Sequence, residues 1–252
     1  MLLPREHGAW AMLITPYVIG VLLTNFNMIH IPLFIGIFFA YLASYPLLLL
    51  IKGTTKGKQA EKWLIIYIVV AVAILSPIIY FYPSLLLLAI ILIPSFLINM
   101  FYAKSNNERA IINDIAGVSG LALTGVAAVL VALSIAYPQL DFMELIYTEQ
   151  ASQLIYVWLL SVSYFLTSIF HVKTLIRERD NLQFAKYSKL YHVFIILFAY
   201  LCLPHNWFLA YIPALIKALV PTAARKPIKI GLIEASHCII FVLLIIILRS
   251  IF

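Results

Sequence analysis

Polar side chains recur along one face of an apolar segment within residues 161–192. Tyr164, Ser168 and His171 are spaced i, i+4 and i+7, so a helix places all three on the same face. Polar groups inside a lipid bilayer are energetically costly and usually face the interior of a helix bundle. The sequence therefore predicts that these three side chains line a polar cavity.

Charged residues follow this face directly along the chain. Lys173 and Arg177 are one helical turn apart, and Glu178 comes immediately after Arg177. Two cationic donors one turn apart can converge on a single anionic group. We expect the helix to leave the bilayer here, with Lys173, Arg177 and Glu178 at a basic mouth of the cavity.

A carboxylate and an imidazole lie three residues apart in the last apolar segment. Glu234 and His237 share a face of the expected helix, and a lone ionised acid there would be costly. Glu234 has three ways to avoid this cost: protonation, pairing with His237, or a salt bridge to another helix. We expect it to point inward, ionised, and to bond to His237, Lys173 or Arg177. The alternative is a residue that snorkels near the interface.

Two further groups of side chains are candidates for the cytoplasmic mouth. Arg5 and His7 precede Trp10 at the start of the first apolar run, where they either anchor the helix at the lipid headgroups or cap a pocket. Tyr102 lies in the polar connection at 99–120 and is a candidate lining residue.

The same connection, 99–120, also has a purely structural interpretation. Asn113 and Asp114 are residue types that favour a helix N-cap. Gly117, Gly120 and Thr124 then form a small-residue face, which commonly allows close helix packing.

The composition of the chain indicates what kind of structural element holds these side chains in place. The chain has 252 residues, 64% of them hydrophobic and only 11% charged, with a mean hydropathy of +1.05. These values exclude a soluble globular domain and indicate one polytopic membrane domain over residues 1–252. The net charge of +7 indicates basic loops and contact with anionic membrane lipids, not with nucleic acid.

Nine apolar runs predict a bundle of nine transmembrane helices. All but one of the 17 Lys and Arg residues then fall on one side of the membrane, so the N-terminus is expected in the cytoplasm and the C-terminus outside. Residues 138–152 form the longest outer loop, which is expected to contain a short interfacial helix. The nine runs are 9–24, 30–51, 63–81, 83–103, 114–137, 153–172, 188–203, 206–220 and 231–249.

Three motifs resemble the YwiC-like family of bacterial membrane proteins. They are PREHGAWAM at 4–12, HVKTLIRER at 171–179 and KPIKIGLIEASH at 226–237. The resemblance implies a multi-pass protein of the bacterial cytoplasmic (inner) membrane. It does not by itself specify an activity.

The architecture also resembles the UbiA superfamily of intramembrane prenyltransferases, which have nine helices and cytoplasmic active-site loops after helices two and six. Those enzymes hold a prenyl diphosphate through Mg²⁺ and Asp-rich motifs. Here the corresponding loops read GTTKGKQAEKW, with only Glu61, and HVKTLIRERDN, with Glu178 and Asp180 among Lys and Arg. Such loops can hold an anion directly but offer few carboxylates for Mg²⁺. We therefore expect no metal site, no cofactor and no Mg²⁺ dependence.

The function expected from these patterns is binding, with or without transfer, of an isoprenoid or other anionic lipid in a basic, cytoplasm-facing cavity. Enzymatic activity stays open, because the fold resembles a prenyltransferase but the Asp-rich motifs are absent. The alternatives are a small-solute or ion transporter that uses His171, Glu234 and His237, and a non-enzymatic membrane subunit with an unspecified protein partner. Convergence of the polar positions near the cytoplasmic end would favour lipid binding, whereas a polar path through the midplane would favour transport.

Overall fold

The structure, a computed structural model, describes residues 1–4, 7–53, 57–204, 206–220 and 227–251. All regular elements in these ranges are helices. The chain divides into two compact units, Met1–Trp158 and Leu159–Phe252. The boundary lies inside α7 (Ser152–Ile176), and the single domain expected over 1–252 stays a prediction.

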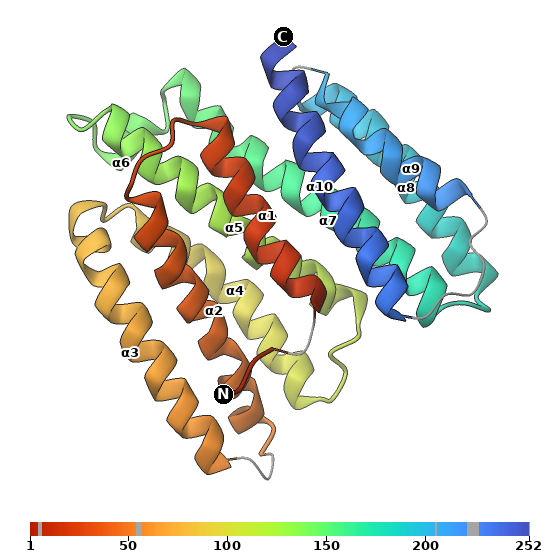
Figure 1. Cartoon of the computed structure of the whole chain (residues 1–252), viewed down its shortest axis with the longest axis horizontal. Helices are drawn as coiled ribbons and strands as arrows, with labels where there is room; N and C mark the ends of the chain where they lie inside the picture. The colour runs from red at the N-terminus through yellow and green to blue at the C-terminus, as the bar shows by residue number, and fades with distance from the viewer. Residues whose placement is uncertain (5–6, 54–56, 205, 221–226, 252) are drawn as a thin grey trace. The chain divides into compact units, whose positions relative to one another are not determined.

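The first unit contains five long helices and two short ones before α7 (Figure 1). Helix α2 packs against α3, and α5 packs against both α1 and α4. The bounds are α1 (His7–Leu23), α2 (His30–Ile51), α3 (Gly57–Phe81), α4 (Leu85–Lys104), α5 (Ile111–Ala136), α6 (Phe142–Leu145) and the 3₁₀ helix η1 (Glu149–Ala151).

Helix α5 forms the core of the first unit. Its middle, from Ala122 to Leu133, is almost continuously buried and consists mainly of Ala, Gly, Val and Leu. Small residues allow neighbouring helices to approach on several sides, so this helix is apolar around most of its circumference. By contrast, α4 has no buried residue in its most apolar stretch, as expected for a helix that faces lipid.

The expected small-residue face of α5 is a packing face. A Cβ on Gly120 would lie 3.0 Å from a methyl carbon of Leu92 on α4. The hydroxyl of Thr124 donates a hydrogen bond of 3.0 Å to the backbone oxygen of Leu13 on α1. These contacts fix α5 between α1 and α4.

The expected N-cap of α5 was wrong. The helix begins at Ile111, and Ala110 occupies the N-cap position without a side-chain hydrogen bond. The extended backbone of Ala110 ends the preceding turn, so the helix begins before the Asn-Asp pair. Asn113 donates instead, from Nδ2, to the backbone oxygen of Glu108 at 2.7 Å.

The second unit contains most of α7, then α8 (Leu182–Cys202), the 3₁₀ helix η2 (Trp207–Tyr211), α9 (Ile212–Leu219) and α10 (Pro227–Ile251). Helix η2 contacts α8, α9 and α10. Hydrogen bonds join α7 to α8, η2 and α10, as the site below describes.

Each of the nine predicted apolar runs corresponds to helix in the described residues, the eighth as η2 together with α9. Six of these helices are long and apolar enough to cross a membrane; α8 is not among them, and α1 and the η2–α9 segment are shorter. A short helix, α6, also forms in the 138–152 connection, where Asp141 and Glu144 make a capping box. The fold is therefore an all-helical membrane bundle with at least six candidate spans in its described part.

Candidate functional site

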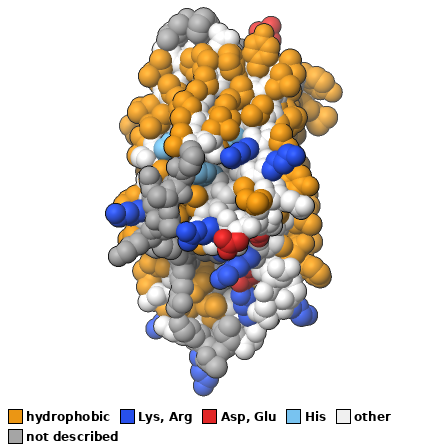
Figure 2. Space-filling model, turned by 90° about the vertical axis from the view of Figure 1, so that its right-hand side faces the viewer, with side chains coloured by type: hydrophobic (Ala, Val, Ile, Leu, Met, Phe, Trp, Pro, Cys, Tyr) orange, Lys and Arg blue, Asp and Glu red, His pale blue; other side chains and the backbone are white. Residues whose placement is uncertain are grey.

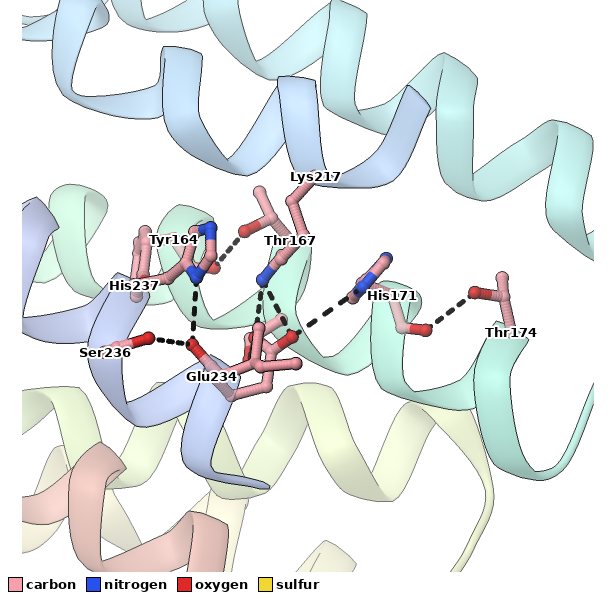
Figure 3. A network of polar contacts seen from close by, with 10 residues as sticks. Tyr164, Thr167, His171, Thr174, Lys217, Glu234, Ser236 and His237 are labelled. Atoms are coloured by element: carbon pink, nitrogen blue, oxygen red, sulfur yellow. Dashed lines mark hydrogen bonds and ion pairs between the residues drawn. The ribbon is translucent and has the colours of Figure 1, made fainter. Parts of the chain in front are cut away.

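A buried ion pair joins two helices of the second unit (Figure 3). Lys217 on α9 donates to both carboxylate oxygens of Glu234 on α10, with Nζ–O distances of 2.8 Å and 2.7 Å. The side chains are only 7% and 12% exposed. Charges in such surroundings persist only where they are paired and hydrogen-bonded, so each side chain depends on the other.

Helix α7 supplies two more partners to the same carboxylate. The hydroxyl of Ser168 donates a short hydrogen bond to Oε2 of Glu234. Nε2 of His171 lies 4.0 Å from Oε1. We call Ser168, His171, Lys217 and Glu234 the Glu234 cluster, in which one carboxylate connects α7, α9 and α10.

The partner expected for Glu234 was different. The sequence predicted His237, Lys173 or Arg177, but the close ion pair is made with Lys217. Nδ1 of His237 lies 2.9 Å from the backbone oxygen of Ile233 in its own helix. Of the three outcomes considered, Glu234 thus adopts the salt bridge to another helix.

Lys217 carried a signal that could have identified it. It is the only charged residue in the helix IPALIKAL, and a lone cation within an apolar segment normally has a specific partner. Its position close to the basic connection after α9 is equally typical of a surface cation.

Aromatic side chains adjoin the Glu234 cluster on its apolar side. The ring of Tyr164 stacks on Phe241 of α10 with centroids 4.0 Å apart. The Tyr164 hydroxyl is buried and has no hydrogen-bond partner among the described residues. It also lies within electrostatic reach of Glu234. The expected face of Tyr164, Ser168 and His171 therefore does point into the bundle.

A second set of hydroxyl groups, not predicted from the sequence, lies one turn away. The hydroxyls of Ser163 and Tyr211 are 2.6 Å apart. Tyr191 of α8 donates to the backbone oxygen of Ser163 at 3.1 Å. These bonds tie α7 to α8 and η2 and hold the surroundings of the cluster in place.

Two further imidazoles lie near the cluster. His192 on α8 is buried, and its Nδ1 is 2.7 Å from the backbone oxygen of Ser188. His192 is within electrostatic reach of both Lys217 and Glu234. His171 is similarly within reach of His192 and His237.

The remaining predicted site residues do not all join this cluster. Lys173 is buried on α7, whereas Arg177 is exposed just beyond the helix, so the two cations differ in their surroundings. Glu178 accepts a hydrogen bond of 2.8 Å from Asn181. Tyr102 belongs to α4 in the first unit. Arg5 lies outside the described residues, and so does the side chain of His7, whose backbone begins α1.

The described residues contain no group of three or more His, Cys, Asp or Glu side chains arranged to hold a metal ion. The Glu234 carboxylate is already engaged by an ammonium group and a hydroxyl.

The apolar helices and the buried ion pair define a multi-pass α-helical membrane protein with a polar cluster inside one of its two units. The family model for "YwiC-like protein" matches residues 3–129. The chain belongs to the YwiC-like family.

Two relatives extend the similarity over nearly the whole chain. The uncharacterized protein YwiC of Bacillus subtilis (strain 168) is 34% identical over 242 residues, which cover 95% of each chain. An uncharacterized protein of Haemophilus influenzae is 27% identical over 248 residues, 98% of each chain. No solved structure matches the chain.

Proposed function

We propose that this protein binds an anionic lipid, an isoprenoid phosphate or a phospholipid, at the basic end of its second unit. In this proposal nine helices span the cytoplasmic membrane in a UbiA-like arrangement, with the N-terminus inside. The ligand is held directly by Lys217 and neighbouring cations, without Mg²⁺. The observation that carries the proposal is the convergence of α7, α9 and α10 on the Glu234 cluster.

The depth of the cluster supports a headgroup site over a path through the whole membrane. Glu234 lies about 10 Å along α10 from Pro227, and His171 lies about 7 Å from the end of α7, at 1.5 Å per residue. The hydrocarbon core is about 30 Å thick. The cluster is therefore nearer to the basic ends of α7 and α10 than to the middle of a span, which supports a site within reach of a lipid headgroup.

The distribution of surface side chains is compatible with a bound lipid. Figure 2 shows a face whose upper end is covered mainly by hydrophobic side chains, while Lys and Arg side chains occur from its middle downward. On α10, Leu232 and Ile239 are 67% and 62% exposed. Exposed apolar residues on the helix that carries Glu234 offer a surface for hydrocarbon chains, and Lys217 offers a cation for a phosphate.

A second candidate function is proton-coupled transport of a small solute. One observation favours it: three imidazoles, His171, His192 and His237, accompany the Lys217–Glu234 pair in one helical bundle. Chains of ionisable groups within membrane helices often form proton pathways. Uptake of a solute by proteoliposomes, driven by a pH gradient, would identify this function.

The test of lipid binding is native mass spectrometry of the purified protein, followed by titration with dioctanoyl phosphatidylglycerol. We expect a bound anionic lipid that EDTA does not remove. The double variant Lys217→Met/Glu234→Gln removes both buried charges together and should lose most of the binding. Lys189→Met removes an exposed cation of α8 and serves as the control.

Two results would contradict the proposal. Equal loss of binding in the double variant and in Lys189→Met would indicate a diffuse basic surface that attracts lipid. Binding that requires Mg²⁺ would indicate a metal site formed by carboxylates such as Glu61, Asp114, Glu178 or Asp180.

A further inference from the structure

The charge balance of the Glu234 cluster restricts how it can accept an anion. Glu234 and Lys217 neutralise each other, and Lys217 donates to both carboxylate oxygens. An added phosphate would place a second negative charge beside the carboxylate in a site that water hardly reaches. Burial of such an uncompensated charge is strongly unfavourable.

The groups around Glu234 offer one way to restore the balance. Titratable side chains from four helices lie within hydrogen-bond or electrostatic reach of one another around the ion pair: Tyr164 and His171 on α7, His192 on α8, Lys217 on α9, and Cys238 on α10. Lys217 is the cation already in contact with the carboxylate. Among these side chains, one added proton is enough to remove the negative charge or to add a positive one.

We propose that a lipid phosphate binds to Lys217 together with one proton, which Glu234 takes up. This inference rests on the proposed lipid-binding function and specifies how the same site works. The phosphate replaces the carboxylate as the partner of the ammonium group, and a proton from the aqueous side neutralises Glu234. No covalent bond between heavy atoms changes, and the net charge of the buried site stays at zero.

The hydrogen-bond geometry allows Glu234 to exist in both protonation states. As a carboxylate, it accepts from Ser168 and Lys217. As a carboxylic acid, it can donate to the Ser168 hydroxyl oxygen, which already lies within hydrogen-bond distance of Oε2. The buried Tyr164 hydroxyl, without a partner among the described residues, provides a further donor for the incoming ligand.

The coupling has a measurable consequence. If one proton is taken up for each lipid bound, the Kd rises about tenfold for each unit by which the pH rises, wherever free Glu234 is ionised. Dioctanoyl phosphatidylglycerol is a suitable probe, because its phosphodiester keeps one negative charge throughout the neutral pH range. Any pH dependence then comes from the protein.

The experiment is isothermal titration calorimetry of the full chain in detergent, from about pH 6 to about pH 8, in two buffers that differ in ionisation enthalpy. The two buffers together count the protons taken up for each lipid bound. We expect about one proton in the wild type and in Glu61→Gln, whose carboxylate is exposed on α3. We expect none in Glu234→Gln, which should bind at every pH with the affinity that the wild type has at low pH. Glycerophosphoglycerol, the headgroup without chains, should bind much more weakly if the ligand is a lipid.

The outcomes separate the two proposals. Binding by the wild type without proton uptake overturns the coupling and leaves lipid binding intact. Proton uptake that persists in Glu234→Gln assigns the proton to an imidazole and overturns the role of Glu234. A folded wild type that binds no lipid at any pH overturns the proposed function itself. If Glu234→Gln does not fold, two other measurements test the proposal. The wild-type proton count tests the coupling. The charge-neutral double variant Lys217→Met/Glu234→Gln, which we expect to bind no lipid, tests the site.

Discussion

Glu234 shows how a single buried charge constrains its neighbours. Its carboxylate lies among three helices and is satisfied by one ammonium group and one hydroxyl, with an imidazole nearby. Removing one partner of a buried ion pair leaves the other charge uncompensated, whereas removing both partners does not. Residue-scale substitutions should therefore behave very differently when they are made singly or together.

We predict that Glu234→Gln lowers the free energy of unfolding by about 3–5 kcal/mol, because the Lys217 ammonium is left buried without a counter-charge. Thermal unfolding in detergent measures this effect, with Glu61→Gln as the control. The double variant Lys217→Met/Glu234→Gln should regain much of the loss. Added dioctanoyl phosphatidylglycerol should raise the Tm of Glu234→Gln more than that of the wild type. A Tm unchanged by Glu234→Gln would mean that the ion pair contributes little.

At the scale of elements, the first unit depends on the close crossing of α1 and α5. A Cβ on Gly20 would lie 2.3 Å from the backbone oxygen of Gly125, and one on Gly125 would lie 2.4 Å from that of Pro16. Both obstacles are backbone atoms, which cannot move aside as a flexible side chain can. Only glycine fits at these two positions, because any Cβ atom would overlap the backbone of the facing helix.

Gly125→Ala should destabilise the protein by about 1–3 kcal/mol, because α1 and α5 must separate or shift. Gly8→Ala is the matched control on α1, since no heavy atom lies within 4 Å of its Cβ position. Alanine at that helical position should be neutral or stabilising, by up to about 1 kcal/mol. The two Tm values in detergent test the prediction. Equal shifts would show that helix propensity, and not packing, determines both.

At the scale of the whole molecule, the arrangement of basic residues predicts the topology. If nine helices span the membrane, all but one of the 17 Lys and Arg residues fall on one side. Six helices of the described part satisfy the length and hydropathy of a span. The short α1 and η2–α9 segments and the more polar α8 determine whether the count reaches nine.

We predict that a C-terminal alkaline phosphatase fusion is active and that a C-terminal green fluorescent protein fusion is dark. Both results follow if the C-terminus lies outside, because each reporter folds on only one side of the membrane. A fusion placed after Arg179 should show the opposite pattern, since this connection is expected in the cytoplasm. Reversed results would require an even number of spans or the opposite orientation.

The amino-acid sequence by itself determined the helices and the direction of their polar faces. Hydrophobic runs and the 3.6-residue period are local properties, so the nine apolar runs and the inward face of Tyr164, Ser168 and His171 could be predicted. The helices extend beyond several runs into the polar connections, as at Gly57 and Ile176, because backbone hydrogen bonding continues where hydropathy falls.

Only the tertiary structure decided which charges meet. Lys173, Arg177 and His237 were the expected partners, but Lys217 is the cation that reaches Glu234. The choice depends on the rotation and axial position of α9 against α10, and packing of the whole second unit sets both. The same holds for Gly125. It must lack a side chain because the backbone of Pro16, more than 100 residues earlier in the chain, packs against it. Contacts between distant segments follow from packing, which no local pattern in the sequence specifies.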